Sequence, residues 1–88
     1  MIHVTLISKD GFYLEKDVES VKIPSYKGET QVLTAHASYV ALIIAGVVEL
    51  ASAGTTEKFE CMDGIVEVAH DKMVILVNGL TKSSDVHA

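Results

Sequence analysis

Short runs of β-branched and aromatic residues, separated by turn signals about every 8 to 12 residues, occupy most of this 88-residue chain. Residues 2–7 (IHVTLI) and 56–61 (TEKFEC) alternate apolar with other side chains, which is the period of a strand with one buried face. KDG at 9–11 and AGT at 53–55 are turn signals. We therefore expect an all-β fold, a flattened antiparallel β-sandwich of roughly 8 to 10 short strands.

Three segments refine this expectation. MVILV (73–77) is apolar at every position, which predicts a central strand buried on both faces. The β-branched and aromatic content of AHASYVALII (35–44), with Gly46 close behind, favours a strand over a helix. Pro24 is expected to end the strand that begins near residue 18. The predicted domain spans residues 1–80, and residues 81–88 form a loose polar tail.

Hydrophobic residues make up 49% of the chain, although a domain of this length buries only a modest core. Part of the apolar surface is therefore expected to be covered by a partner, which indicates a subunit of a larger assembly. The formal net charge is −5, and the chain has scattered lysines and no arginine. Nucleic acids and anionic membrane surfaces are disfavoured as partners, because both are bound by clustered basic side chains.

The chain is expected to have no signal peptide and no membrane-inserted segment, since its most apolar run is shorter than the roughly 20 residues that cross a bilayer. Cys61 is the only cysteine, so no internal disulfide can form, as fits a reducing cytosol. Its place on an alternating segment predicts a small core side chain and not a reactive thiol.

Glu29 and His36 in KGETQVLTAHASYVAL (27–42) suggest at first an active site or a metal site. A catalytic reading would also use Ser38, but an orienting acid, an oxyanion hole and a nucleophile elbow are missing from the pattern. The four histidines lack the spacing of a zinc site. The glycines are assigned to turns that need positive φ. We expect no catalytic residue, no metal, no cofactor and no small-molecule substrate.

The order and spacing of several short segments are more specific than any one of them. In chain order they are VESV (18–21), IP (23–24), GE (28–29), VL (32–33), HA (36–37), GVV (46–48), Phe59, GIVEV (64–68) and VILV (74–77). This ordered set, which covers residues 2 to 80, resembles the epsilon subunit family of the F-type ATP synthases, called delta in mitochondria.

The resemblance implies a flattened β-sandwich at the foot of the central stalk. It implies a non-catalytic rotor subunit that binds the gamma subunit and the ring of c subunits, and that supports coupling of ion transport to ATP synthesis. Such a subunit is peripheral, on the cytoplasmic face of the bacterial inner membrane. The implied contacts with the c-ring are Gly28, Glu29, Thr30, Gln31 and His36. The implied contacts with gamma are Ser8, His36, Tyr39, Val40, Leu42 and Val47.

The sequence departs from the family pattern where Thr34, Ser38 and Ala45 replace prolines, and where Asp63-Gly64 replaces a glycine pair. Each lost proline frees φ and restores a backbone donor, so local geometry is expected to differ there. The family's two C-terminal helices, associated with inhibition and ATP binding, have no counterpart in these residues. Two alternatives remain: a self-associating β-sandwich adaptor, and a hydrolase that uses His36 and Glu29.

Overall fold

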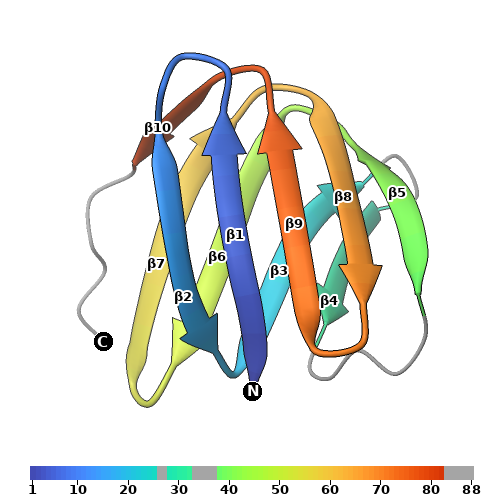
Figure 1. Ribbon diagram of the computed structural model, residues 1–88. Helices are drawn as coiled ribbons and strands as arrows, with labels where there is room; N and C mark the ends of the chain where they lie inside the picture. The colour runs from blue at the N-terminus through green and yellow to red at the C-terminus, as the bar shows by residue number, and fades with distance from the viewer. Residues whose placement is uncertain (26–27, 33–37, 83–88) are drawn as a thin grey trace.

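The structure is a computed structural model that describes residues 1–25, 28–32 and 38–82, where it consists of strands and turns (Figure 1). The strands are β1 (Ile2–Ser8), β2 (Tyr13–Val18), β3 (Ser20–Ser25), β4 (Gly28–Val32), β5 (Tyr39–Ile43), β6 (Gly46–Ser52), β7 (Thr55–Cys61), β8 (Gly64–Ala69), β9 (Lys72–Val77) and β10 (Leu80–Lys82). The all-β prediction is confirmed. Within these ranges, no helix has the length and apolar character needed to cross a membrane.

The ten strands form one sheet in the order β10-β7-β6-β3-β5-β8-β9-β1-β2, and β4 pairs with β3 off this path. All pairs are antiparallel except β1–β9. Strands β3 to β7 come between the β1–β2 hairpin and the β8–β9 hairpin along the chain. In the sheet the two hairpins are neighbours, with β1 beside β9. The two adjoining strands therefore run in the same direction.

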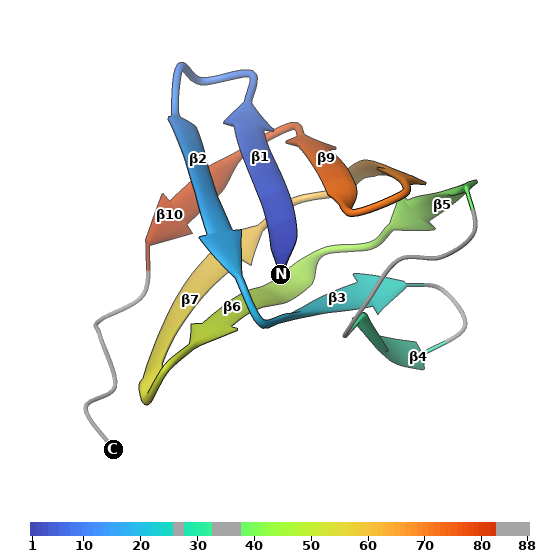
Figure 2. The ribbon, with the colours of Figure 1, turned by 60° about the horizontal axis from the view of Figure 1, so that its bottom comes forward.

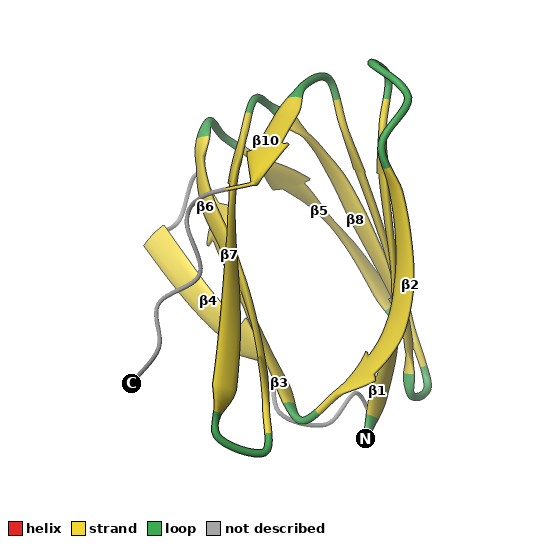
Figure 3. Cartoon of the chain, turned by 90° about the vertical axis from the view of Figure 1, so that its left-hand side faces the viewer, coloured by secondary structure: helices red, strands yellow, loops and turns green. Residues whose placement is uncertain are grey.

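The sheet curls into two facing layers, as Figure 2 and Figure 3 show. One layer holds β5, β8, β9, β1 and β2, and the other holds β10, β7, β6, β3 and β4. The chain passes between layers at Ile44 and Ala45, where the Ile44 N–H donates to the Pro24 carbonyl over 3.0 Å. A Cβ on Gly46 would lie 2.8 Å from the Pro24 Cβ, so this crossing requires glycine.

Alternate side chains of both layers fill the space between them. Phe59 is the largest of these side chains, and its ring centroid lies 5.7 Å from that of Phe12. Cys61 is 5% exposed, which confirms its assignment to the core. The core consists of Ile2, Val4, Leu6, Val18, Val21, Ile23, Ile43, Val48, Leu50, Phe59, Cys61, Val66, Val68, Met73, Ile75 and Val77.

Two predictions about individual strands are wrong. In β9 only Met73, Ile75 and Val77 are buried, while Val74 is 41% and Leu76 is 39% exposed. The layer that contains β9 is covered on its inner face alone, so a uniformly apolar strand still exposes one side. Pro24 lies inside β3, which continues to Ser25, because its carbonyl still accepts a hydrogen bond although it has no N–H to donate.

The glycines divide into two groups. Among the described residues, Gly11 and Gly54 have positive φ, at 104° and 81°, as expected for turns. Gly64 is explained differently, since a Cβ there would lie 2.1 Å from the Leu76 carbonyl oxygen. The assignment of every glycine to a positive-φ turn is therefore wrong.

The strand β10 also includes residues 81 and 82, which the predicted domain boundary at residue 80 left in the tail.

An ion-pair cluster joins the two ends of the curled sheet. The Lys16 ammonium on β2 donates to the Glu57 carboxylate on β7, and Lys82 Nζ on β10 lies 3.4 Å from the other oxygen of Glu57. Glu57 is mostly buried, and the hydrogen bond from Lys16 is the main reason that its pKa is lowered. Within the described residues, β2 pairs with neither β7 nor β10, so these ion pairs link the two layers at this point.

Candidate partner-binding surface

The solvent-facing side of the layer formed by β5, β8, β9, β1 and β2 carries a continuous apolar row. The strand registers place five side chains side by side across these strands, in the order Leu42, Ile65, Leu76, Ile7 and Tyr13. Leu42 is 59% exposed and Tyr13 60%, while Ile7 is half-buried. This row follows from strand alternation, because the neighbours of each residue point into the core.

A second row lies beside the first, in the order Val40, Glu67, Val74, Thr5 and Glu15. Val40 is 59% exposed. Shallow depressions lie on both sides of Glu67, one bounded by Ile65, Val74 and Leu76 and the other by Val40 and Ala69. We call the six residues of β5, β8 and β9 in these two rows the outer face: Val40, Leu42, Ile65, Glu67, Val74 and Leu76.

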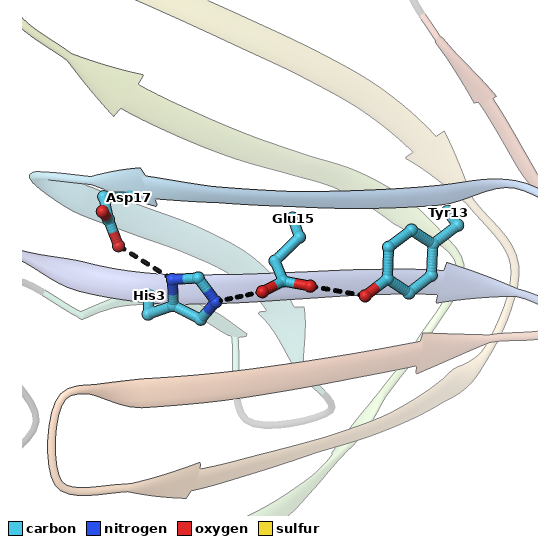
Figure 4. A network of polar contacts seen from close by, with 4 residues as sticks. All are labelled: His3, Tyr13, Glu15 and Asp17. Atoms are coloured by element: carbon cyan, nitrogen blue, oxygen red, sulfur yellow. Dashed lines mark hydrogen bonds and ion pairs between the residues drawn. The ribbon is translucent and has the colours of Figure 1, made fainter.

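A polar network borders the outer face on β1 and β2 (Figure 4). His3 Nδ1 lies 2.9 Å from Asp17 Oδ1, and His3 Nε2 lies 2.7 Å from Glu15 Oε1. The Tyr13 hydroxyl donates to Glu15 Oε2 over 2.5 Å. A ring nitrogen must carry a proton to bond a carboxylate, so two such bonds require the doubly protonated imidazolium.

The pKa shifts in this network agree with that assignment. The hydrogen bond with Asp17, followed by the one with Glu15, raises the pKa of His3 above 6.5. The hydrogen bond from Tyr13, followed by the one from His3, lowers the pKa of Glu15. The same Glu15 carboxylate raises the pKa of Tyr13. The border of the outer face is therefore a set of paired polar groups, in which one cation lies between two carboxylates.

Contiguous exposed apolar side chains of this kind make the outer face a candidate surface for binding another molecule. The described residues hold no cluster of three or more His, Cys, Asp or Glu side chains suited to a metal ion. Burial raises the pKa of the Cys61 thiol, which disfavours the nucleophilic thiolate.

Comparison with known proteins assigns the fold to a family. Residues 1–83 match the family described as "ATP synthase, Delta/Epsilon chain, beta-sandwich domain". The chain belongs to this family. The epsilon chain of Campylobacter hominis is 34% identical over 80 residues, covering 89% of this chain and 62% of the relative. The epsilon chain of Halalkalibacterium halodurans is 32% identical over 85 residues, covering 97% and 64%.

Two solved structures share the fold of this delta/epsilon-type domain. One is the Euglena gracilis mitochondrial ATP synthase (OSCP/F1/c-ring), with a TM-score of 0.81, 20% identity and coverage of 92% of this chain and 52% of the other. The second is the Tetrahymena thermophila mitochondrial ATP synthase central stalk and c-ring, with a TM-score of 0.74, 14% identity and coverage of 91% and 65%. The chain thus spans about three fifths of the curated relatives it matches.

The residues predicted to contact gamma lie in different parts of this delta/epsilon-type domain. Val40 and Leu42 lie on the outer face, and the backbone of Tyr39 begins β5 beside them. Val47 is 39% exposed on β6, in the opposite layer. Ser8 is only 4% exposed, and its hydroxyl donates to the Asp10 carboxylate. The structure therefore brings Val40 and Leu42 together, with the Tyr39 backbone beside them, and places Ser8 and Val47 elsewhere.

The residues predicted to contact the c-ring lie on β4. Gly28, Glu29, Thr30 and Gln31 pair through their backbones with Ser25, Pro24, Ile23 and Lys22 of β3. They form a strand along the edge of β3. His36 and Thr34 lie outside the described residues.

Sequence reasoning missed Ile65, Glu67, Val74 and Leu76 as surface residues. The alternation of GIVEVA (64–69) contained the signal, because a charged Glu67 puts its own side of the strand in water and Val66 and Val68 in the core. For β9 no such signal exists, since MVILV is apolar on both sides. Only the pairing of β9 with β8 shows that Val74 and Leu76 face outward, because they lie opposite Glu67 and Ile65.

Proposed function

We propose that this chain is a non-catalytic central-stalk subunit of an F-type ATP synthase. In this role it joins gamma to the c-ring and supports coupling of ion transport to ATP synthesis. Membership in the delta/epsilon family supports the proposal, as does the likeness to a structure described as a central stalk and c-ring. The subunit would be peripheral, on the cytoplasmic face of the bacterial inner membrane.

The observation that carries the gamma assignment is the exposed outer face, which includes the gamma candidates Val40 and Leu42. Fully burying one Val or Leu side chain contributes about 1.5 to 3 kcal/mol. Several such side chains in register can therefore hold a partner on a sheet face with no pocket. Tyr39 begins the same strand, whereas Ser8, His36 and Val47 are proposed gamma contacts on the resemblance alone.

For the c-ring, we assign the strand β4. It lies off the main path of the sheet and pairs with β3, and Figure 3 shows it at the margin of the molecule. Glu29, Thr30 and Gln31 are proposed as contacts with the polar loops of a c-ring on the resemblance. Gly28 and His36 complete the proposed set.

Binding to the gamma subunit of the same synthase tests the proposal. Wild-type chain should retain purified gamma at low-micromolar concentration. Replacing Leu42 with Gln should weaken binding about tenfold, because the variant forfeits apolar burial at the interface. The matched control is Met62→Gln, since Met62 is 56% exposed but lies in the turn between β7 and β8. A wild-type chain that does not bind gamma would disprove the assignment.

The alternative of a self-associating module predicts a homo-oligomer. Light scattering after size-exclusion chromatography, with and without gamma, distinguishes a self-associating module from a central-stalk subunit. A stable oligomer that does not bind gamma supports the alternative. A monomer that forms a stoichiometric complex with gamma supports the central-stalk role.

A further inference from the structure

Glu67 is the one charged residue of the outer face. The registers put Val40 on one side of it and Val74 on the other, and Ile65 precedes it on the same side of β8. Besides Glu67, one depression beside it is lined by Ile65, Val74 and Leu76, and the other by Ser38, Val40, Val68 and Ala69. Its carboxylate therefore has apolar neighbours on three sides, Val40, Val74 and Ile65, while Ala69 and Lys72 stand in the next row.

Within the described part of the chain, Glu67 makes no side-chain hydrogen bond and no ion pair. The nearest register-defined cation is Lys72, which lies opposite Ala69 in the next row. His3, Glu15 and Asp17 pair with one another at the border. Water is thus left to solvate the Glu67 carboxylate in the free chain.

A partner that covers the apolar neighbours must also remove this water. An ionised carboxylate taken out of water without a counter-charge carries a large free-energy penalty, which can exceed the gain from the surrounding apolar contacts. The penalty is offset when the partner supplies a cation with hydrogen-bond donors. Charge complementarity therefore constrains what can occupy the outer face.

We propose that the partner seated on the outer face presents an apolar surface with a single Lys or Arg that pairs with Glu67. This inference rests on the proposed function, in which that partner is the gamma subunit. A second copy of this chain fits less well, because it would bring its own acidic face and a net charge of −5. The Glu67 pair supplies orientation, and the apolar rows supply most of the buried area.

The test measures the dissociation constant for gamma at several salt concentrations, using wild type, Glu67→Gln, Glu67→Lys and the control Glu60→Gln. Glu60 is an exposed carboxylate on β7, in the opposite layer. Loss of one partner of a desolvated charge pair should weaken binding by about tenfold to a hundredfold for Glu67→Gln, and further for Glu67→Lys. Glu60→Gln should bind as wild type does.

The two proposals can fail separately. If wild type binds gamma and Glu67→Gln binds equally tightly, the Glu67 pairing is overturned and the central-stalk role stands. If Glu60→Gln weakens binding as much as Glu67→Gln, long-range attraction explains the data and the specific pair is also overturned. If wild type does not bind gamma, both proposals fall. Glu67→Gln keeps the shape of an exposed side chain, so thermal unfolding should match wild type.

Discussion

His3 and Asp17 lie directly opposite each other across the β1–β2 pair, with Nδ1 of the imidazole 2.9 Å from Oδ1 of the carboxylate. The same ring reaches Glu15, which is two residues away on the same side of β2. A single protonated ring thus pairs with two carboxylates at the edge strand of the layer that carries the outer face, and one net negative charge is left. Opposite charges that face each other across two strands contribute to the stability of a sheet.

Stability should depend on pH through His3. Its pKa is raised in the folded state, so its contribution is complete below 6.5 and is lost as pH rises through the folded pKa. The melting temperature of wild type should therefore exceed that of His3→Asn at acid pH, and the difference should shrink above neutrality. Thermal unfolding followed by circular dichroism at a series of pH values measures this.

Asp17→Asn provides the matched NMR test, because Asp17 is the main cause of the raised pKa of His3. The His3 ring resonance should titrate at lower pH in this variant than in wild type. His3→Asn identifies the resonance by removing it. An unchanged titration would show that the cross-strand contact does not form in solution.

Glu57 should stabilise the domain by closing the curled sheet. Replacing it with Gln should lower the free energy of unfolding by about 1 kcal/mol, because Lys16 and Lys82 lose their shared counter-charge. The folded pKa lies below its usual 4.5, so the contribution is present above that value and is lost as pH falls through the folded pKa. Urea unfolding at neutral and acid pH measures both effects.

Glu49→Gln is the control for that experiment. Glu49 Oε1 lies 3.9 Å from Lys58 Nζ within the β6–β7 hairpin, where backbone hydrogen bonds already join the two strands. Its replacement should cost less than that of Glu57. Equal losses would mean that joining the two ends of the sheet brings no special stability.

Gly64→Ala should destabilise the fold by about 3 kcal/mol, since the added Cβ meets the backbone of β9 and not a movable side chain. Gly79→Ala should cost about 1 kcal/mol or less, because its nearest neighbour is Met62 Cγ at 3.2 Å and a methionine side chain can move. Denaturant unfolding of both variants checks the contrast. Similar losses would contradict the close approach of β8 and β9.

Two neighbouring residues of β9 should respond very differently to truncation. Ile75→Ala should cost about 2 to 5 kcal/mol, because it leaves a cavity in a fully buried site. Val74→Ala should change stability by about 0.5 kcal/mol or less, as expected for a side chain that is 41% exposed. Urea unfolding measures both, and a large loss for Val74→Ala would mean that a second layer covers this face in solution.

The strand positions could be predicted because each depends on local properties. Alternation, β-branched residues and turn residues act over a few neighbours, so β1, β7 and β8 were accessible from their own residues. The candidate site was only partly accessible: Val40 and Leu42 followed from the family resemblance, while Ile65 and Val74 did not. Their exposure depends on which strands lie beside them and on which face a second layer covers.

The sequence by itself determined an all-β chain, a core that includes Cys61, and membership in a recognisable family. Only the tertiary structure decided that β1 runs parallel to β9, that Gly64 is needed for close approach, and that MVILV exposes Val74 and Leu76. The reason is physical. A strand's period of two separates its faces, but the curl of the whole sheet selects which face becomes the core and which becomes the docking surface.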